Sequence, residues 1–134
     1  MSQEIIERLN KLLEAERSGV KTADYLGEII TNKEIKEGMK TVLMDEGACC
    51  KGLYDAIIEY GGTPVTTTGD FADKVKATEG EKEKLVLLNK GQGWVAKKVD
   101  ELISMVEKEN VLTFLKKMKE DHVCNINWLE EKLK

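Results

Sequence analysis

Four stretches of this 134-residue chain repeat apolar residues in alternating steps of three and four. Such spacing keeps the apolar side chains on one stripe of a helix, so each stretch is predicted to be a long helix with one buried face. The break signals between the stretches place these helices at about residues 4–30, 33–60, 81–107 and 111–132. Charged residues make up 34% of the chain and Pro occurs once, a composition that suits long solvated helices better than a β-sandwich. The predicted fold class is therefore all-α.

Each apolar stripe is interrupted near its middle by a polar residue. A buried polar side chain is costly unless it has a partner, so four such interruptions at similar depth require a common explanation. If the helices form a bundle, the interrupting residues and two neighbours on the same stripes converge on one buried layer. Its six candidate members are Glu16, Glu46, Cys49, Gln92, His122 and Asn125.

The lengths of the connections indicate the topology. Few residues separate the first two helices, and few separate the last two, so each pair is expected to be antiparallel. The segment of residues 61–80 is much longer than the 2–8 residues, roughly, that join antiparallel neighbours. It includes DFADKVKAT at residues 70–78, predicted to be a short helix with Phe71 and Val75 against the bundle. This segment favours one long crossover between the second and third long helices, as in ferritin-like four-helix bundles.

Length and charge narrow the class of protein. A chain of 134 residues suits a single domain, so residues 1–134 are expected to form one unit. The net charge is −4 with no basic stripe, which argues against nucleic acid as a partner. The start MSQEIIERLN has no apolar signal region and no stretch is apolar enough to span a membrane, so no membrane association is expected. Three cysteines suggest no disulfide framework, which together with the absent signal predicts a cytoplasmic protein.

Ferritin-like di-iron bundles supply a template for the polar layer. They place one Glu on each of two helices and a Glu-x-x-His pair on each of the other two. The positions match here but the chemistry differs, since only two of the four carboxylates are present and the His stands where a Glu is expected. The four slots are taken, in chain order, by Glu16, by Glu46 with Cys49, by Gln92, and by His122 with Asn125.

Five segments also resemble a group of uncharacterised ferritin-like domains: LLEAERSG, DEGACC, GDFADK, LNKGQGWV and DHVCNI. That group carries an Asn-Lys/Arg-Gly-Gln-Gly-Trp-Val motif on the third long helix and a His-x-x-Asn pair on the fourth. The resemblance extends from about Leu9 to Leu129 and implies a ferritin-like bundle with a degenerate di-iron site. It implies no specific activity, and it suggests that Gln92, His122 and Asn125 are the group's own pattern.

Two explanations of the polar layer remain open from the sequence. In the first, the layer binds metal, either one ion or the two ions of a two-metal oxidase, and the mixture of Cys, His and carboxylate suits Zn, Fe or Cu better than Mg or Ca. In the second, the layer is a closed hydrogen-bond network in which Gln92 and Asn125 bridge and one carboxylate is protonated or paired with a His122 cation.

The two explanations correspond to two classes of function. The first is a ferritin-like domain that binds one metal ion or a small ligand. The second is a non-catalytic helical domain that acts through its surface, as a homodimer or as an accessory to another protein. The sequence names no substrate or reaction.

Two glycines in the third long helix also need a reason. Gly91 and Gly93 bracket Gln92, and each costs roughly 1 kcal/mol relative to Ala in a helix interior. Close packing of a neighbouring element, or room for something bound beside Gln92, would explain them.

Overall fold

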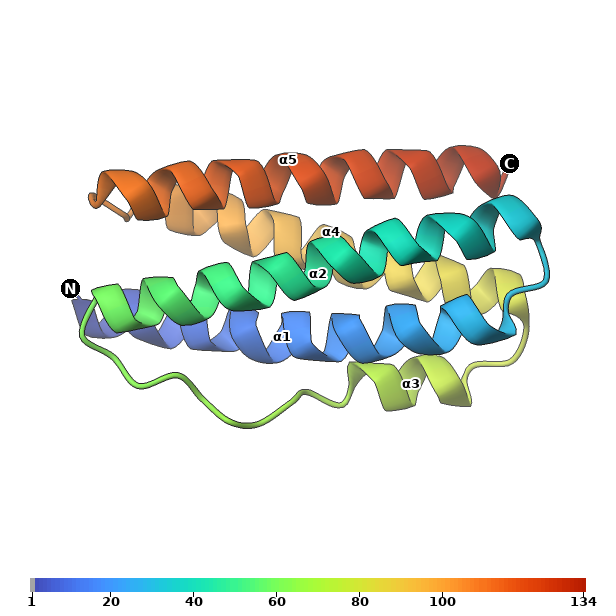
Figure 1. The fold of residues 1–134 in the computed structure, drawn as a ribbon, viewed down its shortest axis with the longest axis horizontal. Coiled ribbons are helices and arrows are strands. Elements are labelled where there is room, and N and C mark those ends of the chain that lie inside the picture. Colours follow the sequence, from blue (N-terminus) through green and yellow to red (C-terminus); the bar gives the residue numbers. More distant parts are fainter. Residues whose placement is uncertain (1) are drawn as a thin grey trace.

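The computed structural model describes residues 2–134, which form five helices. The four long helices are α1 (Ser2–Ile29), α2 (Lys33–Glu59), α4 (Glu81–Ile103) and α5 (Glu109–Lys132), and the short one is α3 (Phe71–Ala77). They form the predicted all-α bundle, with α1 and α2 antiparallel and α4 and α5 antiparallel (Figure 1).

The connection between α2 and α4 is the expected crossover. It leaves the end of α2, runs the length of the bundle along α1 and carries α3 near its far end, so that α2 and α4 are parallel (Figure 1). Side chains on one face of α1 hold this segment. Asn10 accepts from the Val65 amide at 2.9 Å and donates to the Thr63 carbonyl at 3.2 Å. Further along, Arg17 donates to the carbonyls of Val65 and Thr67. The crossover is thus fixed to the bundle by specific contacts.

Local signals explain both ends of α2 and the end of α4. The Asn32 side chain accepts from the Ile35 amide at 3.0 Å and caps α2. Gly61 ends α2 in a left-handed conformation with φ of 81°, which glycine adopts without strain. The third long helix was expected to reach residue 107 but ends at Ile103, because Met105 and Val106 both donate to the Leu102 carbonyl and close a tight turn.

Buried apolar side chains form two clusters, one toward each end of the bundle. One cluster contains Leu9, Leu53 and Leu115, and the other contains Leu26, Met39 and Leu88. The buried residues Glu16, Glu46, Gln92 and His122 belong to neither cluster and fall between them in the sequence of each long helix. The polar layer therefore divides the core.

Among residues 2–134, no helix combines the length and the apolar character needed to cross a membrane.

Candidate metal centre

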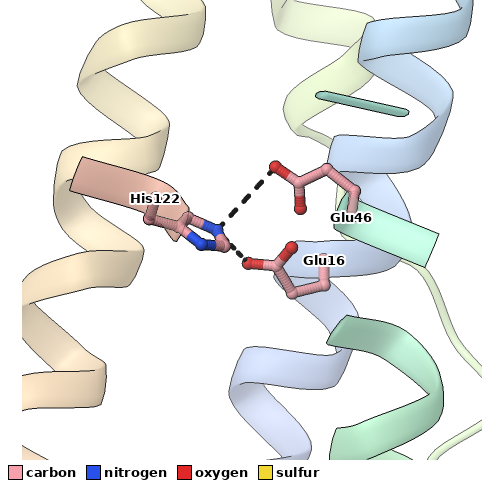
Figure 2. Close-up of side chains that lie close together, drawn as sticks. All are labelled: Glu16, Glu46 and His122. Atoms are coloured by element: carbon pink, nitrogen blue, oxygen red, sulfur yellow. Dashed lines mark hydrogen bonds and ion pairs between the residues drawn. The ribbon is translucent and has the colours of Figure 1, made fainter. Parts of the chain in front are cut away.

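Three buried side chains from three helices meet at the centre of the bundle. Glu16 of α1, Glu46 of α2 and His122 of α5 each offer one ligand atom, and these atoms lie within 4.8 Å of one another (Figure 2). The residues are 1%, 3% and 2% exposed, respectively. Within the described residues, this is the one group of three or more His, Cys, Asp or Glu side chains close enough to share an ion.

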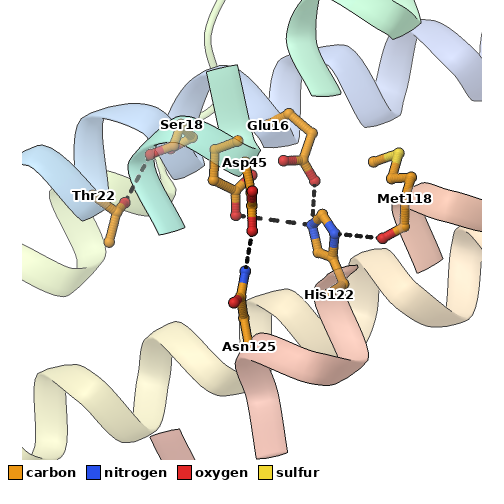
Figure 3. Close-up of polar contacts among 8 residues, drawn as sticks. Glu16, Ser18, Thr22, Asp45, Met118, His122 and Asn125 are labelled. Carbon is orange, nitrogen blue, oxygen red and sulfur yellow. Dashed lines mark hydrogen bonds and ion pairs between the residues drawn. The ribbon is translucent and has the colours of Figure 1, made fainter. Parts of the chain in front are cut away.

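The orientation of His122 is fixed by its own helix. Its Nδ1 lies 3.0 Å from the Met118 carbonyl, one turn earlier in α5, and must donate a proton there because a carbonyl only accepts (Figure 3). Its Nε2 then faces the two acids, 2.8 Å from Glu16 Oε1 and 3.8 Å from Glu46 Oε1. A metal-binding histidine usually donates its second ring N–H to a carbonyl or carboxylate in this way, which leaves the first nitrogen available.

One proton is held between His122 and Glu16. Burial raises the pKa of Glu16, and the hydrogen bond and positive charge of His122 offset this only in part. Burial lowers the pKa of His122, but the hydrogen bond and negative charge of Glu16, helped by the Met118 carbonyl, outweigh it and raise that pKa overall. Both groups therefore hold protons more tightly than in water, and their 2.8 Å contact has the length of a hydrogen bond to a charged group.

The hydrogen bonding of the layer is incomplete. Glu16 Oε2, Glu46 Oε2 and both amide atoms of Gln92 are buried and have no hydrogen-bond partner within the described part of the chain. All three residues line one cavity of about 530 Å³ between α1, α3 and α4. An unpaired buried polar atom costs about 1–3 kcal/mol, so these atoms are available to bind water or another ligand in the cavity.

Sequence reasoning missed Gly19, which makes room for one of the acids. A Cβ atom at this position of α1 would lie 2.8 Å from Glu46 Oε2 and 2.9 Å from its Cδ. Any other residue would have to displace the carboxylate. The signal was a glycine in a helix interior three residues after Glu16, the same kind of signal that Gly91 provided.

The element that covers the cavity explains Gly91. A Cβ at Gly91 would lie 2.7 Å from the Phe71 ring at the start of α3, so the glycine admits that ring. The Ser18 hydroxyl accepts from the Ala72 amide at 2.9 Å and anchors α3 to α1. Nothing lies within 4 Å of a Cβ at Gly93, so packing within residues 2–134 does not explain that glycine.

Two of the six expected layer members lie apart from the cluster. Asn125 was expected to be buried but is only half-buried, and its amide donates to Asp45 Oδ2 at 3.0 Å instead of bridging the acids (Figure 3). Cys49 is buried as expected, but it packs in the apolar cluster on the Leu53 side and its thiol is not among the three close ligand atoms. Burial and then the negative charge of Glu16 raise the pKa of Cys49 far above its usual range, which favours the thiol in the metal-free protein.

Comparison with known proteins agrees with the fold. A family model described as "Domain of unknown function (DUF6306)" matches residues 3–131. A crystal structure described as a ferritin-like, diiron-carboxylate protein from Bacillus anthracis superposes with a TM-score of 0.89 and 21% sequence identity, over 99% of this chain and 97% of that one. A comparison with curated proteins found no match. At this identity the crystal structure shows a common fold, so the chain has the ferritin-like fold. Because the family model covers nearly the whole chain, the chain belongs to the DUF6306 domain family.

Proposed function

We propose that this ferritin-like domain binds a single metal ion through Glu16, Glu46 and His122. One observation carries the proposal: the three ligand atoms lie within 4.8 Å of one another. It agrees with the second buried oxygen of each acid, which has no hydrogen-bond partner within residues 2–134. Two carboxylate oxygens and an imidazole nitrogen oriented by a backbone carbonyl form a competent ligand set for a divalent ion.

A metal-free network is supported less well. A closed network would pair every buried donor and acceptor, as protein interiors do in most cases. Here the contact of His122 with Glu16 satisfies one oxygen of one acid, while Gln92 and Asn125, the two expected bridges, form no hydrogen bond with either acid. A divalent ion would neutralise both carboxylates and replace the proton that His122 and Glu16 share.

Two ions do not fit this chain. A di-iron bundle supplies four carboxylates and two histidines. Within the described residues only two carboxylates and one histidine come together: Glu16, Glu46 and His122. At the position on α4 where a di-iron bundle has a further acid, this chain has the neutral Gln92. With two negative charges the site can balance one divalent ion, not two. Di-iron chemistry is therefore not expected of it.

The ligand chemistry selects among the ions considered from the sequence. With Cys49 outside the cluster, the set contains oxygen and nitrogen only, which favours iron or zinc over a thiolate-bound copper ion. Bound there, such an ion would supply Lewis acidity toward an oxygen-bearing ligand that enters through the cavity.

The test is metal analysis of protein purified without chelator or affinity tag, followed by titration of metal-free protein with Fe(II) and Zn(II). We expect one ion per chain. Glu46→Gln should abolish stoichiometric binding, whereas Asp45→Asn should retain it, because Asp45 lies next in sequence but pairs with Asn125 outside the cluster. Equal loss in both variants, or no binding by the parent protein, would overturn the proposal.

Three expectations from the sequence stay predictions. These are a homodimer, a cytoplasmic location and a single unit formed by residues 1–134. Light scattering of the purified protein at several concentrations would check the homodimer. Fractionation of the source cells would check the location, and limited proteolysis would check the single unit.

A further inference from the structure

The cavity above the candidate metal centre has a polar floor. Gln92 is 4% exposed, and its amide oxygen and nitrogen both lack a hydrogen-bond partner within residues 2–134. Glu16 and Glu46 line the same cavity and each contributes a buried oxygen without a partner there. A volume of about 530 Å³ falls within the range of small-molecule sites, roughly 300–1,000 Å³.

The walls and the rim differ in character from the floor. Phe71, Leu88, Trp94 and Val95 give apolar surface along the cavity, and Trp94 is 44% exposed although it is a large aromatic residue. Two lysines at the rim, Lys11 and Lys90, are exposed and form no ion pair with residues 2–134. Of the two acids at the rim, Asp70 pairs with Lys74, whereas Glu14 accepts from the neutral Thr67 hydroxyl.

We propose that this cavity binds a small monocarboxylic acid with an apolar body. The carboxylate lies at the floor, where it accepts from the Gln92 amide and completes the coordination of the metal ion, and the apolar body lies against Phe71, Leu88 and Trp94. This inference rests on the proposed function, because the acid needs the ion. It assigns Gln92 to the ligand of the cavity and not to the metal.

Charge explains why a carboxylate fits this cavity better than a neutral or cationic ligand. Without an ion, Glu16 and Glu46 repel an anion from the floor. A divalent ion cancels their two charges, and three lysines of the lining, Lys11, Lys74 and Lys90, then outnumber its two remaining acids, Glu14 and Asp70, so the cavity is electropositive. A neutral alcohol would lose this attraction, and a cationic ligand would be repelled. Metal and acid should therefore bind cooperatively.

The fluorescence of Trp94 provides the measurement. The chain has two tryptophans, and Trp128 lies away from the cavity over Gly38, so Trp128→Phe leaves Trp94 as the single reporter. We would titrate octanoate, octanol and octylamine into this variant, both zinc-loaded and metal-free. The expected result is a saturable change with octanoate in the zinc-loaded form. Octanol should bind at least about tenfold more weakly, as expected for loss of a charged hydrogen-bonded group.

Substitutions at Gln92 test the assigned contact. Gln92→Leu removes the donor, and Gln92→Glu keeps the shape while placing a negative charge beside the incoming carboxylate; each should weaken octanoate binding about tenfold or more. Thermal melts show that each variant is folded, and metal analysis of each separates a lost ion from a lost acid site.

The two proposals fail in different ways. If zinc binds but octanoate does not, or if octanol binds equally well, the acid site is overturned and the metal site stands. If octanoate binds with unchanged affinity in both Gln92 variants, the assigned contact is overturned. If zinc does not bind at all, the proposed function fails and the acid site, which needs the ion, fails with it.

Discussion

Replacing both buried acids by glutamine should make the protein more stable than wild type without metal and less stable than wild type with metal. Glu16 and Glu46 are 1% and 3% exposed, and His122 lies 2.8 Å from one and 3.8 Å from the other. The Glu16→Gln, Glu46→Gln double variant keeps the size and hydrogen-bonding capacity of both side chains but removes their charge. The new amide in place of the Glu16 carboxylate can still donate to His122 Nε2, so the variant loses the cost of burying charge and retains a contact.

The magnitudes follow from burial and from linkage. Replacing a buried ion pair by well-packed hydrophobic residues stabilises some proteins by about 1–4 kcal/mol, and we expect about 1–2 kcal/mol here because the glutamines are still polar. For a chain of this size about 1 kcal/mol shifts the melting temperature by roughly 4 °C, so the metal-free double variant should melt about 4–8 °C above metal-free wild type. An ion at a hundredfold excess over its Kd should stabilise wild type by about 2.7 kcal/mol, or roughly 10 °C, and the variant by nothing.

The assay is four thermal melts: wild type and double variant, each with chelator and with Zn(II) or Fe(II). The variant should melt higher with chelator and wild type should melt higher with metal. If no ion stabilises wild type and the variant still melts higher, the metal proposal is refuted and the acids belong to a metal-free network. If the variant melts lower under both conditions, the assumed cost of the buried charges is wrong.

Three further results are expected. The pKa values of Glu16 and His122 are raised from 4.5 and 6.5, so the folded metal-free protein holds more protons than the unfolded chain. Its melting temperature with chelator should therefore fall as the pH rises above about 5, and a rise in melting temperature would contradict the shared proton. Gly19→Ala puts a Cβ 2.8 Å from Glu46 Oε2, so the metal affinity measured by titration should fall about tenfold or more. This should hold even if the better helix propensity of Ala raises the stability of α1 by up to roughly 1 kcal/mol, and an unchanged affinity would show that the carboxylate moves freely. Lys84 is buried and donates to two carbonyls in the last turn of α3, at 3.1 and 3.0 Å. Lys84→Met should therefore lower the free energy of unfolding by about 1.5–3 kcal/mol and speed hydrogen exchange in α3 first, whereas uniform loss of protection across the bundle would contradict this local role.

The sequence predicted the helices and the crossover because both depend on short-range information. Apolar spacing of three and four residues defines the buried stripe of each helix without reference to any other helix. Asn32 and Gly61 determine helix ends by their own hydrogen bonding and backbone conformation. The length of the segment between α2 and α4 excluded a tight turn. Glu16, Glu46, Gln92 and His122 were found because a polar residue on an apolar stripe is visible in one dimension.

Asn125 and Cys49 show where periodicity stops being informative. Each lies three residues after a layer residue, and three residues turn a helix by about 300°, so each sits about 60° round the helix from its neighbour and one turn further along it. Small rotations of the packed helices decide which way such a side chain faces. In α2 Cys49 faces the apolar cluster, and in α5 Asn125 is half-buried and donates to Asp45.

The sequence alone determined the helices and the depth at which polar residues interrupt the core, and it favoured the crossover topology. Only the tertiary structure decided which of those residues meet, how the His122 ring is turned by Met118, and that Gly19 and Gly91 make room for a carboxylate and a phenyl ring. The physical reason is that a pattern along one helix specifies which face is buried, whereas a site needs distances between atoms on different helices. Those distances are set by the packing of all the side chains together.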